Sequence, residues 1–147
     1  VDPTFTTVVN VQRARIHGAT LAGRQALGTW RLDGELTVQQ ARDADTDARL
    51  VRRAKHHGRA GVAYAPGPWQ AGLDVAAAGA RFDSAANTPI SRMGGYALLD
   101  AYARWAFRPG LAVAGRLRNL LDKRYELAQG YNTAPRQFVL TLEYSAP

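Results

Sequence analysis

Apolar and polar residues alternate at every second position along much of this chain. The clearest example is residues 30–39, where every even-numbered residue is uncharged and every odd-numbered residue is polar. A period of two residues is typical of a β-strand, because successive side chains of a strand point to opposite faces of the sheet. This segment therefore predicts a strand with one uncharged face and one polar face.

The same alternation recurs along the rest of the chain, whereas the helical period of 3.6 residues is almost absent. Four further segments are clear and three are weaker. The clear ones are residues 69–77, 99–107, 111–117 and 138–144, and the weaker ones are about 6–12, 15–24 and 59–65. The pattern predicts an all-β protein of about seven to eight strands.

The connections between these segments are alternately short and long. Residues 25–29, 65–68 and 108–110 are short and rich in Gly or Pro, whereas residues 40–58, 83–94 and 121–136 are long. An antiparallel up-and-down order then places the short turns at one end and the long loops at the other, as in bacterial transmembrane β-barrels. Residues 13–15 are the exception, a short connection where a long loop is expected.

Large aromatic residues gather next to the predicted short turns: Trp30, Tyr64, Trp69, Trp105 and Phe107. All except Tyr64, whose register the sequence does not fix, fall on the uncharged face. Such a ring is typical of the aromatic girdle at a membrane interface. The alternative is that these residues form the core of a soluble barrel, with the uncharged face pointing inward. The gathering at one end and the abundance of Ala and Gly favour the membrane interpretation.

Composition narrows the class of protein. A chain of 147 residues corresponds to one domain, and the absence of cysteine excludes disulfides, cysteine-ligated zinc and a thiol nucleophile. No apolar run reaches the length of about 18 residues that a membrane helix needs. The net charge of +7 fits nucleic acid, lipopolysaccharide phosphates or a charged barrel interior. No Ser/His/Asp set, phosphate-binding loop or carboxylate pair indicates an enzyme.

Two motifs have some features of metal sites. Residues 43–47 have the D-x-D-x-D rhythm of a calcium loop, but Ala48 stands where such a loop requires glycine and no glutamate closes it. His56 and His57 are adjacent, so on a strand they would face opposite ways. We therefore expect no metal site.

The C-terminal part of the chain resembles a known family. Residues 119–126, N-L-L-D-K-R-Y-E, resemble the N-L-F-D-K-x-Y-E run before the last strand of TonB-dependent outer-membrane receptors. Residues 130–136, G-Y-N-T-A-P-R, resemble the G-Y-x-T-x-x-R that follows it. Upstream, residues 10–18, 50–55 and 92–95 are similar to blocks of the cobalamin (vitamin B12) receptors of this family. The resemblance covers essentially the whole chain.

The resemblance implies a 22-stranded transmembrane barrel with a plug domain inside it. Residues 1–147 would form the C-terminal third of that barrel, and the plug domain is absent from them. The family binds and imports scarce ligands, here cobalamin or a siderophore-like molecule, and its plug is pulled by TonB. We therefore expect a transport protein of the bacterial outer membrane, surrounded by lipid and lipopolysaccharide, with no cofactor and no nucleic-acid partner. The last residues, 144–147, depart from the family's usual terminal aromatic residue.

The resemblance also suggests one ligand contact within a basic cluster at residues 52–59. In the cobalamin receptors the first arginine of the L-x-R-R-A-K block touches the ligand, and by match this is Arg52. A guanidinium suits that role because cobalamin carries amides and a phosphodiester. Arg53 would face the opposite way if the strand has begun. The family's partner tyrosine falls in the loop after residue 83, which is short here and has no tyrosine. A nucleic-acid motif and a merely solvated charge cluster are the alternatives.

The rival fold is a small closed eight-stranded barrel. It would be either a structural outer-membrane protein or a lipocalin-like soluble binder. Closure of the sheet and the direction of the uncharged face distinguish it from a segment of a larger barrel.

Overall fold

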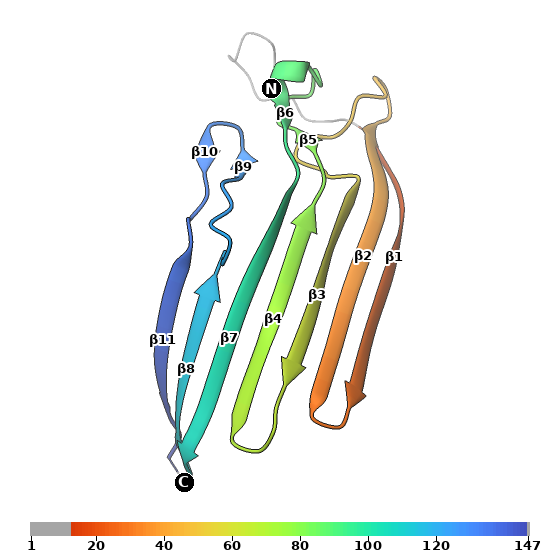
Figure 1. The fold of residues 1–147 in the computed structure, drawn as a ribbon. Coiled ribbons are helices and arrows are strands. Elements are labelled where there is room, and N and C mark those ends of the chain that lie inside the picture. Colours follow the sequence, from red (N-terminus) through yellow and green to blue (C-terminus); the bar gives the residue numbers. More distant parts are fainter. Residues whose placement is uncertain (1–12, 147) are drawn as a thin grey trace.

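The computed structural model describes residues 13–146 and shows one large curved antiparallel sheet (Figure 1). Within that range no helix is long and apolar enough to cross a membrane. The seven strands of the sheet are β1 (Ala14–Leu27), β2 (Trp30–Asp43), β3 (His56–Tyr64), β4 (Trp69–Ala78), β7 (Tyr96–Arg108), β8 (Leu111–Arg118) and β11 (Gln137–Tyr144).

The strands follow one another across the sheet in the order β1-β2-β3-β4-β7-β8-β11, so each pairs with its neighbour in the chain. The prediction of an antiparallel up-and-down all-β segment is therefore confirmed. Strands β1 and β11 lie at the two edges and do not pair with each other within residues 13–146. The alternative of a closed eight-stranded barrel is thus wrong for this part of the chain. The strand expected at residues 6–12 lies outside the described residues.

The short turns and the long loops lie at opposite ends of the sheet, as the sequence predicted (Figure 1). The short turns contain Gly28, Gly67 and Gly110, whose φ angles of 61°, 60° and 74° lie in the left-handed region that favours glycine. The long loops carry small elements that the sequence did not indicate, because two or three residues are too few to show a period: β5 (Arg81–Phe82), a 3-10 turn at Pro89–Ser91, β6 (Arg92–Met93), β9 (Glu126–Ala128) and β10 (Tyr131–Asn132).

The hairpin of β1 and β2 is longer than expected. Pairing runs over 14 residues of each strand, from Leu27 opposite Trp30 to Ala14 opposite Asp43. The sequence placed these strands at 15–24 and 30–39, because residues 25–29 were assigned to the turn and Gln40 and Arg42 interrupt the uncharged face of β2. The connection to β3 is correspondingly shorter, since β2 ends at Asp43 and β3 begins at His56.

The sheet has no substantial apolar core. The buried apolar residues among those described are four alanines and one methionine. By contrast, the uncharged face stays open along its length, with Leu36, Leu73 and Leu140 exposed to 54%, 44% and 67%. A soluble barrel would bury such a face, so this surface requires an apolar environment from outside the chain.

The polar face carries ion pairs between strands. Arg59 on β3 contacts Glu35 on β2 at 3.2 Å, directly opposite it in the register. Arg116 on β8 lies 3.8 Å from Asp74 and 4.0 Å from Asp100, two carboxylates that face each other on β4 and β7. The arginine offsets the repulsion of two like charges held in a directly opposed pair.

The aromatic residues meet at the short-turn end of the uncharged face. The Trp69 and Trp105 rings stack with centroids 4.9 Å apart and planes 3° apart, and Phe107 lies 5.7 Å from Trp105. Tyr64 pairs with Trp30 in the register, with ring centroids 4.6 Å apart. The register thus places Tyr64 on the same face as the other four, and the expected ring of aromatic residues is observed.

Candidate ligand-binding site

Arg52 lies in the loop between β2 and β3, at the long-loop end of the sheet. Its φ of 59° is left-handed, and its backbone N–H donates to the carbonyl of Phe82 at 2.7 Å. Its side-chain Nε donates to Oδ1 of Asp83 at 2.5 Å. The rest of the guanidinium makes no hydrogen bond to residues 13–146, and the side chain is 57% exposed. The backbone and Nε of Arg52 are therefore held by hydrogen bonds, whereas its two terminal nitrogens are free of them within residues 13–146.

Asp83 connects three long loops. One carboxylate oxygen accepts the hydrogen bond from Arg52, and the other accepts the backbone N–H of Gln129 at 3.1 Å. The Gln129 side chain in turn donates to the carbonyl of Ile90 at 2.8 Å. The hydrogen bond and charge of Arg52 lower the pKa of Asp83, and the same hydrogen bond raises the pKa of Arg52. Both groups therefore stay charged at neutral pH.

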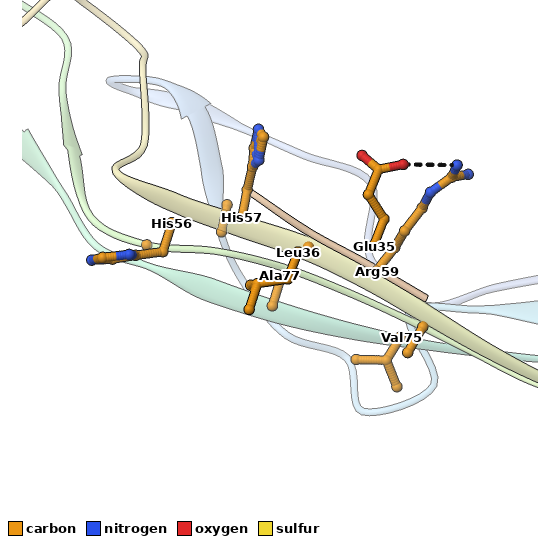
Figure 2. A pocket seen from close by; sticks show the side chains of 11 residues that line it. Glu35, Leu36, His56, His57, Arg59, Val75 and Ala77 are labelled. Atoms are coloured by element: carbon orange, nitrogen blue, oxygen red, sulfur yellow. Dashed lines mark hydrogen bonds and ion pairs between the residues drawn. The ribbon is translucent and has the colours of Figure 1, made fainter. Parts of the chain in front are cut away.

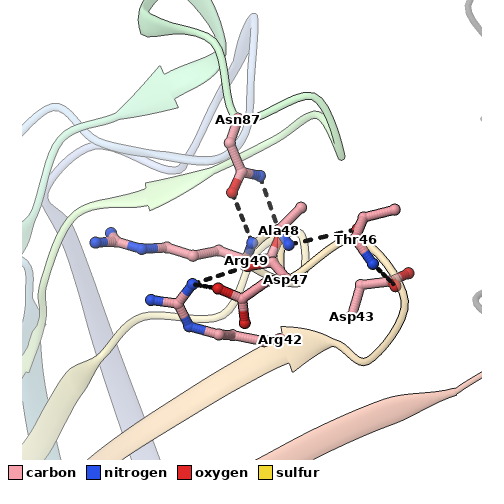
Figure 3. Close-up of polar contacts among 7 residues, drawn as sticks. All are labelled: Arg42, Asp43, Thr46, Asp47, Ala48, Arg49 and Asn87. Atoms are coloured by element: carbon pink, nitrogen blue, oxygen red, sulfur yellow. Dashed lines mark hydrogen bonds and ion pairs between the residues drawn. The ribbon is translucent and has the colours of Figure 1, made fainter.

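Asn87 ties the first two of these loops together (Figure 3). Its Oδ1 accepts the backbone N–H of Arg49 at 2.6 Å, and its Nδ2 donates to the Arg49 carbonyl at 3.0 Å. One amide side chain thus pairs with both backbone groups of one residue, as a neighbouring strand would. The loop that carries Arg52 is held on two sides.

Residues 43–47 form a hydrogen-bonded turn and not a calcium loop (Figure 3). Oδ1 of Asp43 accepts the backbone N–H groups of Asp45 and Thr46 at 2.8 and 3.0 Å. The other two carboxylates form ion pairs with arginines: Asp45 with Arg13 at 2.6 Å and Asp47 with Arg42 at 2.7 Å. The three carboxylates therefore have three separate sets of partners.

His56 and His57 point to opposite faces of β3, as predicted (Figure 2). His57 shares the polar face with Glu35 and Arg59, whereas His56 lies at the end of a shallow apolar groove of about 460 Å³ on the uncharged face. Gly58 and Ala60 form the floor of this groove, because their small side chains leave a hollow between β2 and β4.

A second cavity, of about 280 Å³, opens on the polar face below the loops. Arg52, Arg53 and His57 line it together with residues of β4, β5, β7 and β9. The full lining is Gln39, Arg52, Arg53, Ala54, His57, Ala76, Ala77, Ala78, Arg81, Tyr96 and Leu127. Strand β3 begins only at His56. Arg53 was expected to face the opposite way from Arg52 only if the strand had already begun, and this condition is not met.

Arg81 is the functional candidate that the sequence analysis missed. It lies on the two-residue strand β5 and is only 4% exposed. Its Nη2 donates to the carbonyl of Glu126, and its guanidinium lies 5.2 Å above the Tyr96 ring. A single arginine in a short loop strand has no periodic pattern to mark it, so only the fold brings it to the cavity.

The residues that carried the family resemblance organise the last loop. The Asn119 side chain is buried, its Oδ1 accepts the backbone N–H of Lys123 at 2.8 Å, and its Nδ2 donates to the Lys123 carbonyl at 3.0 Å. Oδ1 of Asp122 accepts the backbone N–H of Arg136 at 2.9 Å. Both residues have positive φ angles, 50° and 51°. Their role is to shape the loop between β8 and β11.

Comparison with known proteins identifies the family. Residues 1–120 match the family model for TonB dependent receptor-like β-barrels. The chain is also 32% identical over 136 residues to the vitamin B12 transporter BtuB of Photobacterium profundum, a match that covers 92% of this chain and 22% of BtuB. The chain therefore belongs to the TonB-dependent receptor β-barrel family. Members of this family are transport proteins of the bacterial outer membrane and not enzymes.

Solved structures agree on the fold. The ferric-catecholate import receptor Fiu from K12 E. coli matches with a TM-score of 0.77 and 23% identity over 89% of this chain and 21% of its own. The ferripyoverdine receptor of Pseudomonas aeruginosa matches with a TM-score of 0.76 and 18% identity, over 89% of this chain and 19% of its own. The copper transporter OprC matches with a TM-score of 0.75 and 20% identity, over 89% of this chain and 23% of its own. The chain spans about a fifth of the length of these relatives.

Proposed function

We propose that this chain forms the C-terminal part of the barrel of a receptor that binds and imports cobalamin. The observation that carries the proposal is the match to the vitamin B12 transporter BtuB, at 32% identity across 92% of this chain. A siderophore-like ligand is the second candidate, because the iron-import receptors Fiu and the ferripyoverdine receptor share the fold. Their identities of 23% and 18% support the fold alone.

Arg52 is the proposed ligand contact within this chain. It is held at the long-loop end of the sheet, on the polar-face cavity, with its terminal nitrogens making no hydrogen bond within residues 13–146. The ion pair with Asp83 orients the side chain and leaves those nitrogens available for amide or phosphodiester oxygens. An arginine that is already oriented loses less entropy when it binds.

The surroundings and partners follow from the same proposal. The exposed uncharged face would lie against lipid, with the aromatic ring at the periplasmic interface and lipopolysaccharide around the outer end. The polar face, with its ion pairs, would line the wet interior. TonB would act through a plug domain inside the completed barrel.

A chimaeric receptor tests the proposal. This chain replaces the matching segment of the Photobacterium profundum vitamin B12 transporter, and uptake of labelled cobalamin is measured in cells that lack their own transporter. We expect uptake that depends on TonB and is abolished when the plug is removed. The unmodified transporter is the control for expression and insertion. A chimaera that inserts normally and takes up a ferric siderophore, but no cobalamin, would reject cobalamin as the ligand.

A further inference from the structure

The cavity on the polar face combines positive charge with an absence of acid. Three arginines and one histidine line it, and no carboxylate is among its eleven lining residues. Asp83, outside this lining, forms an ion pair with Arg52 and also interacts electrostatically with Arg81, so one negative charge stands against three arginines. Arg53 and Arg81 have no ion pair within residues 13–146. The cavity therefore has a surplus of cationic groups.

Arg81 is an unusual member of this group. Charged side chains are rarely buried without a partner, because an unpaired buried charge is strongly unfavourable. Arg81 is 4% exposed, and its Nη1 is buried without a hydrogen-bond partner within the described residues. Its other contacts are to a neutral carbonyl and to the Tyr96 ring. These two contacts orient the guanidinium and carry no negative charge.

The size of the cavity defines what it can accept. A volume of about 280 Å³ lies just below the usual range of sites that enclose a whole small molecule. It is sufficient for a single charged group. Arginine forks match the oxygen geometry of phosphate, and neighbouring main-chain and aromatic contacts hold Arg81 in place for such a group.

We propose that the cavity between Arg53 and Arg81 is an anion subsite that accepts a phosphate group. The subsite deepens the proposed function, since it rests on the polar face being the ligand-facing side of a receptor. The three arginines then have different roles. Arg52 contacts the ligand at the opening of the cavity, whereas Arg53 and Arg81 bind the phosphate inside it. The phosphate is supplied by a phosphodiester in the transported ligand or by a free phosphate ion.

The test uses the chimaeric receptor described above, purified in detergent, with inorganic phosphate as the probe. Phosphate binding is measured by calorimetry against a constant background of chloride. We expect Arg53→Gln and Arg81→Gln each to weaken binding roughly ten- to a hundredfold, as loss of a hydrogen bond to a charged partner implies. Arg81→Lys keeps the charge but loses the fork, so its loss should be intermediate. Arg59→Gln, a polar-face arginine outside the cavity, is the matched control and should not change affinity.

Two results would overturn the subsite. One is an unchanged phosphate affinity in Arg53→Gln, an exposed position where folding is not at risk. The other is an equal loss in Arg59→Gln, which would show that general positive charge attracts the ion. If Arg81→Gln fails to fold, the Arg53 and Arg59 variants still decide between these outcomes.

A second arm identifies the source of the phosphate and keeps this inference separate from the proposed function. Cobalamin is compared with cobinamide, which lacks the phosphodiester. If the ligand supplies the phosphate, Arg53→Gln weakens binding of cobalamin and leaves cobinamide unaffected. If neither changes while phosphate binding is lost, the subsite stands and its source is free phosphate. Intact phosphate binding in a chimaera that binds no corrinoid would overturn the proposed ligand and leave the subsite supported.

Discussion

Arg52 and Asp83 form an ion pair of 2.5 Å between two loops that are 31 residues apart in the sequence. The same carboxylate also accepts a backbone hydrogen bond from Gln129 in a third loop. One ion pair therefore positions the proposed ligand contact and holds the loops around it. These two roles of Arg52 are separable by experiment.

Arg52→Ala in the chimaeric receptor should weaken cobalamin binding about ten- to a hundredfold, because one hydrogen bond to a charged partner is lost. Asp83→Asn keeps the arginine but removes its ion pair, so it should weaken binding less. The affinity of each variant for cobalamin is measured by calorimetry. Equal losses in the two variants would show that Arg52 acts only by holding the loops. No loss in either would remove Arg52 from the site.

The tie between the loops should also depend on pH. The Arg52 hydrogen bond lowers the pKa of Asp83 below its value in the unfolded chain, which is about 3.9. The stability that the pair contributes is therefore fully present above that unfolded value, and it is lost as the pH falls through the lower folded pKa. Protease cleavage of the loops should stay slow at neutral and mildly acidic pH and rise only below about pH 4.

The Asp83→Asn variant provides the control for this titration. It has no carboxylate at this position. Its loops should therefore be cleaved faster than those of the parent already at neutral pH, and the cleavage rate should show no step below about pH 4. A step of the same size in the variant would assign the pH dependence to another group.

Leu73 and Asp74 are neighbours that test the assignment of the two faces. Leu73 lies in the middle of β4 on the uncharged face, and Leu73→Arg should cost roughly 2–4 kcal/mol of barrel stability in lipid, the cost of an arginine at the bilayer midplane. Asp74→Asn should cost much less, because it also relieves repulsion from Asp100 opposite it. Unfolding in lipid vesicles measures both. Equal losses would mean that the faces are assigned wrongly.

The stacked pair Trp69 and Trp105 should contribute stability beyond the area that each ring covers. A double-mutant cycle with alanine at both positions should give a coupling energy of about 0.5–1.5 kcal/mol. The pair Trp30 and Trp105, on strands separated by β3 and β4, should show almost none and serves as the control. A coupling near zero for the stacked pair would show that the tryptophans act independently in the interface.

Gly72 lies under the ring of Tyr102, which in turn lies under the Arg116 guanidinium at 5.1 Å. A Cβ at position 72 would approach the ring to 2.5 Å, so Gly72→Ala must displace Tyr102. We expect a loss of about 1–3 kcal/mol, as in other overpacked sites. Gly34→Ala is the matched control, because its nearest neighbour would be a carbonyl oxygen at 3.7 Å. Equal stability of the two variants would contradict this packing.

The sequence predicted the main sheet well because alternation is a direct result of strand geometry. Residues 69–77 and 111–117 came within one residue of β4 and β8, whose strands alternate without interruption. Strand β1 was bounded less closely. Its uncharged face carries Arg15, His17 and Gln25, so alternation alone could not show that pairing with β2 continues to both ends.

The site was less accessible to sequence reasoning. Arg52 was found through a motif, and its position in the loop could be anticipated. The contacts of Arg52 could not be anticipated, since Phe82 and Asp83 reach it from a second loop, and Gln129 of a third loop binds Asp83. The alternation rule does not fix the direction of Arg53, because this residue lies before the start of β3 and follows the left-handed Arg52. Contacts between loops depend on the register of the strands below them, which no local pattern encodes.

The length of the β1–β2 hairpin explains why charges interrupt its uncharged face. From Trp30 in the aromatic ring, β2 continues for another 13 residues to Asp43. With the usual rise and tilt of barrel strands, its far end stands about 30 Å above the ring, whereas the apolar band of an outer membrane is only about 25 Å tall. With the uncharged face against lipid as proposed, Arg15 and Arg42, which face each other at that end, would lie in the headgroup layer or in water. On this side the barrel wall would rise above the bilayer as a hydrated rim, whose outer surface need not be apolar at all.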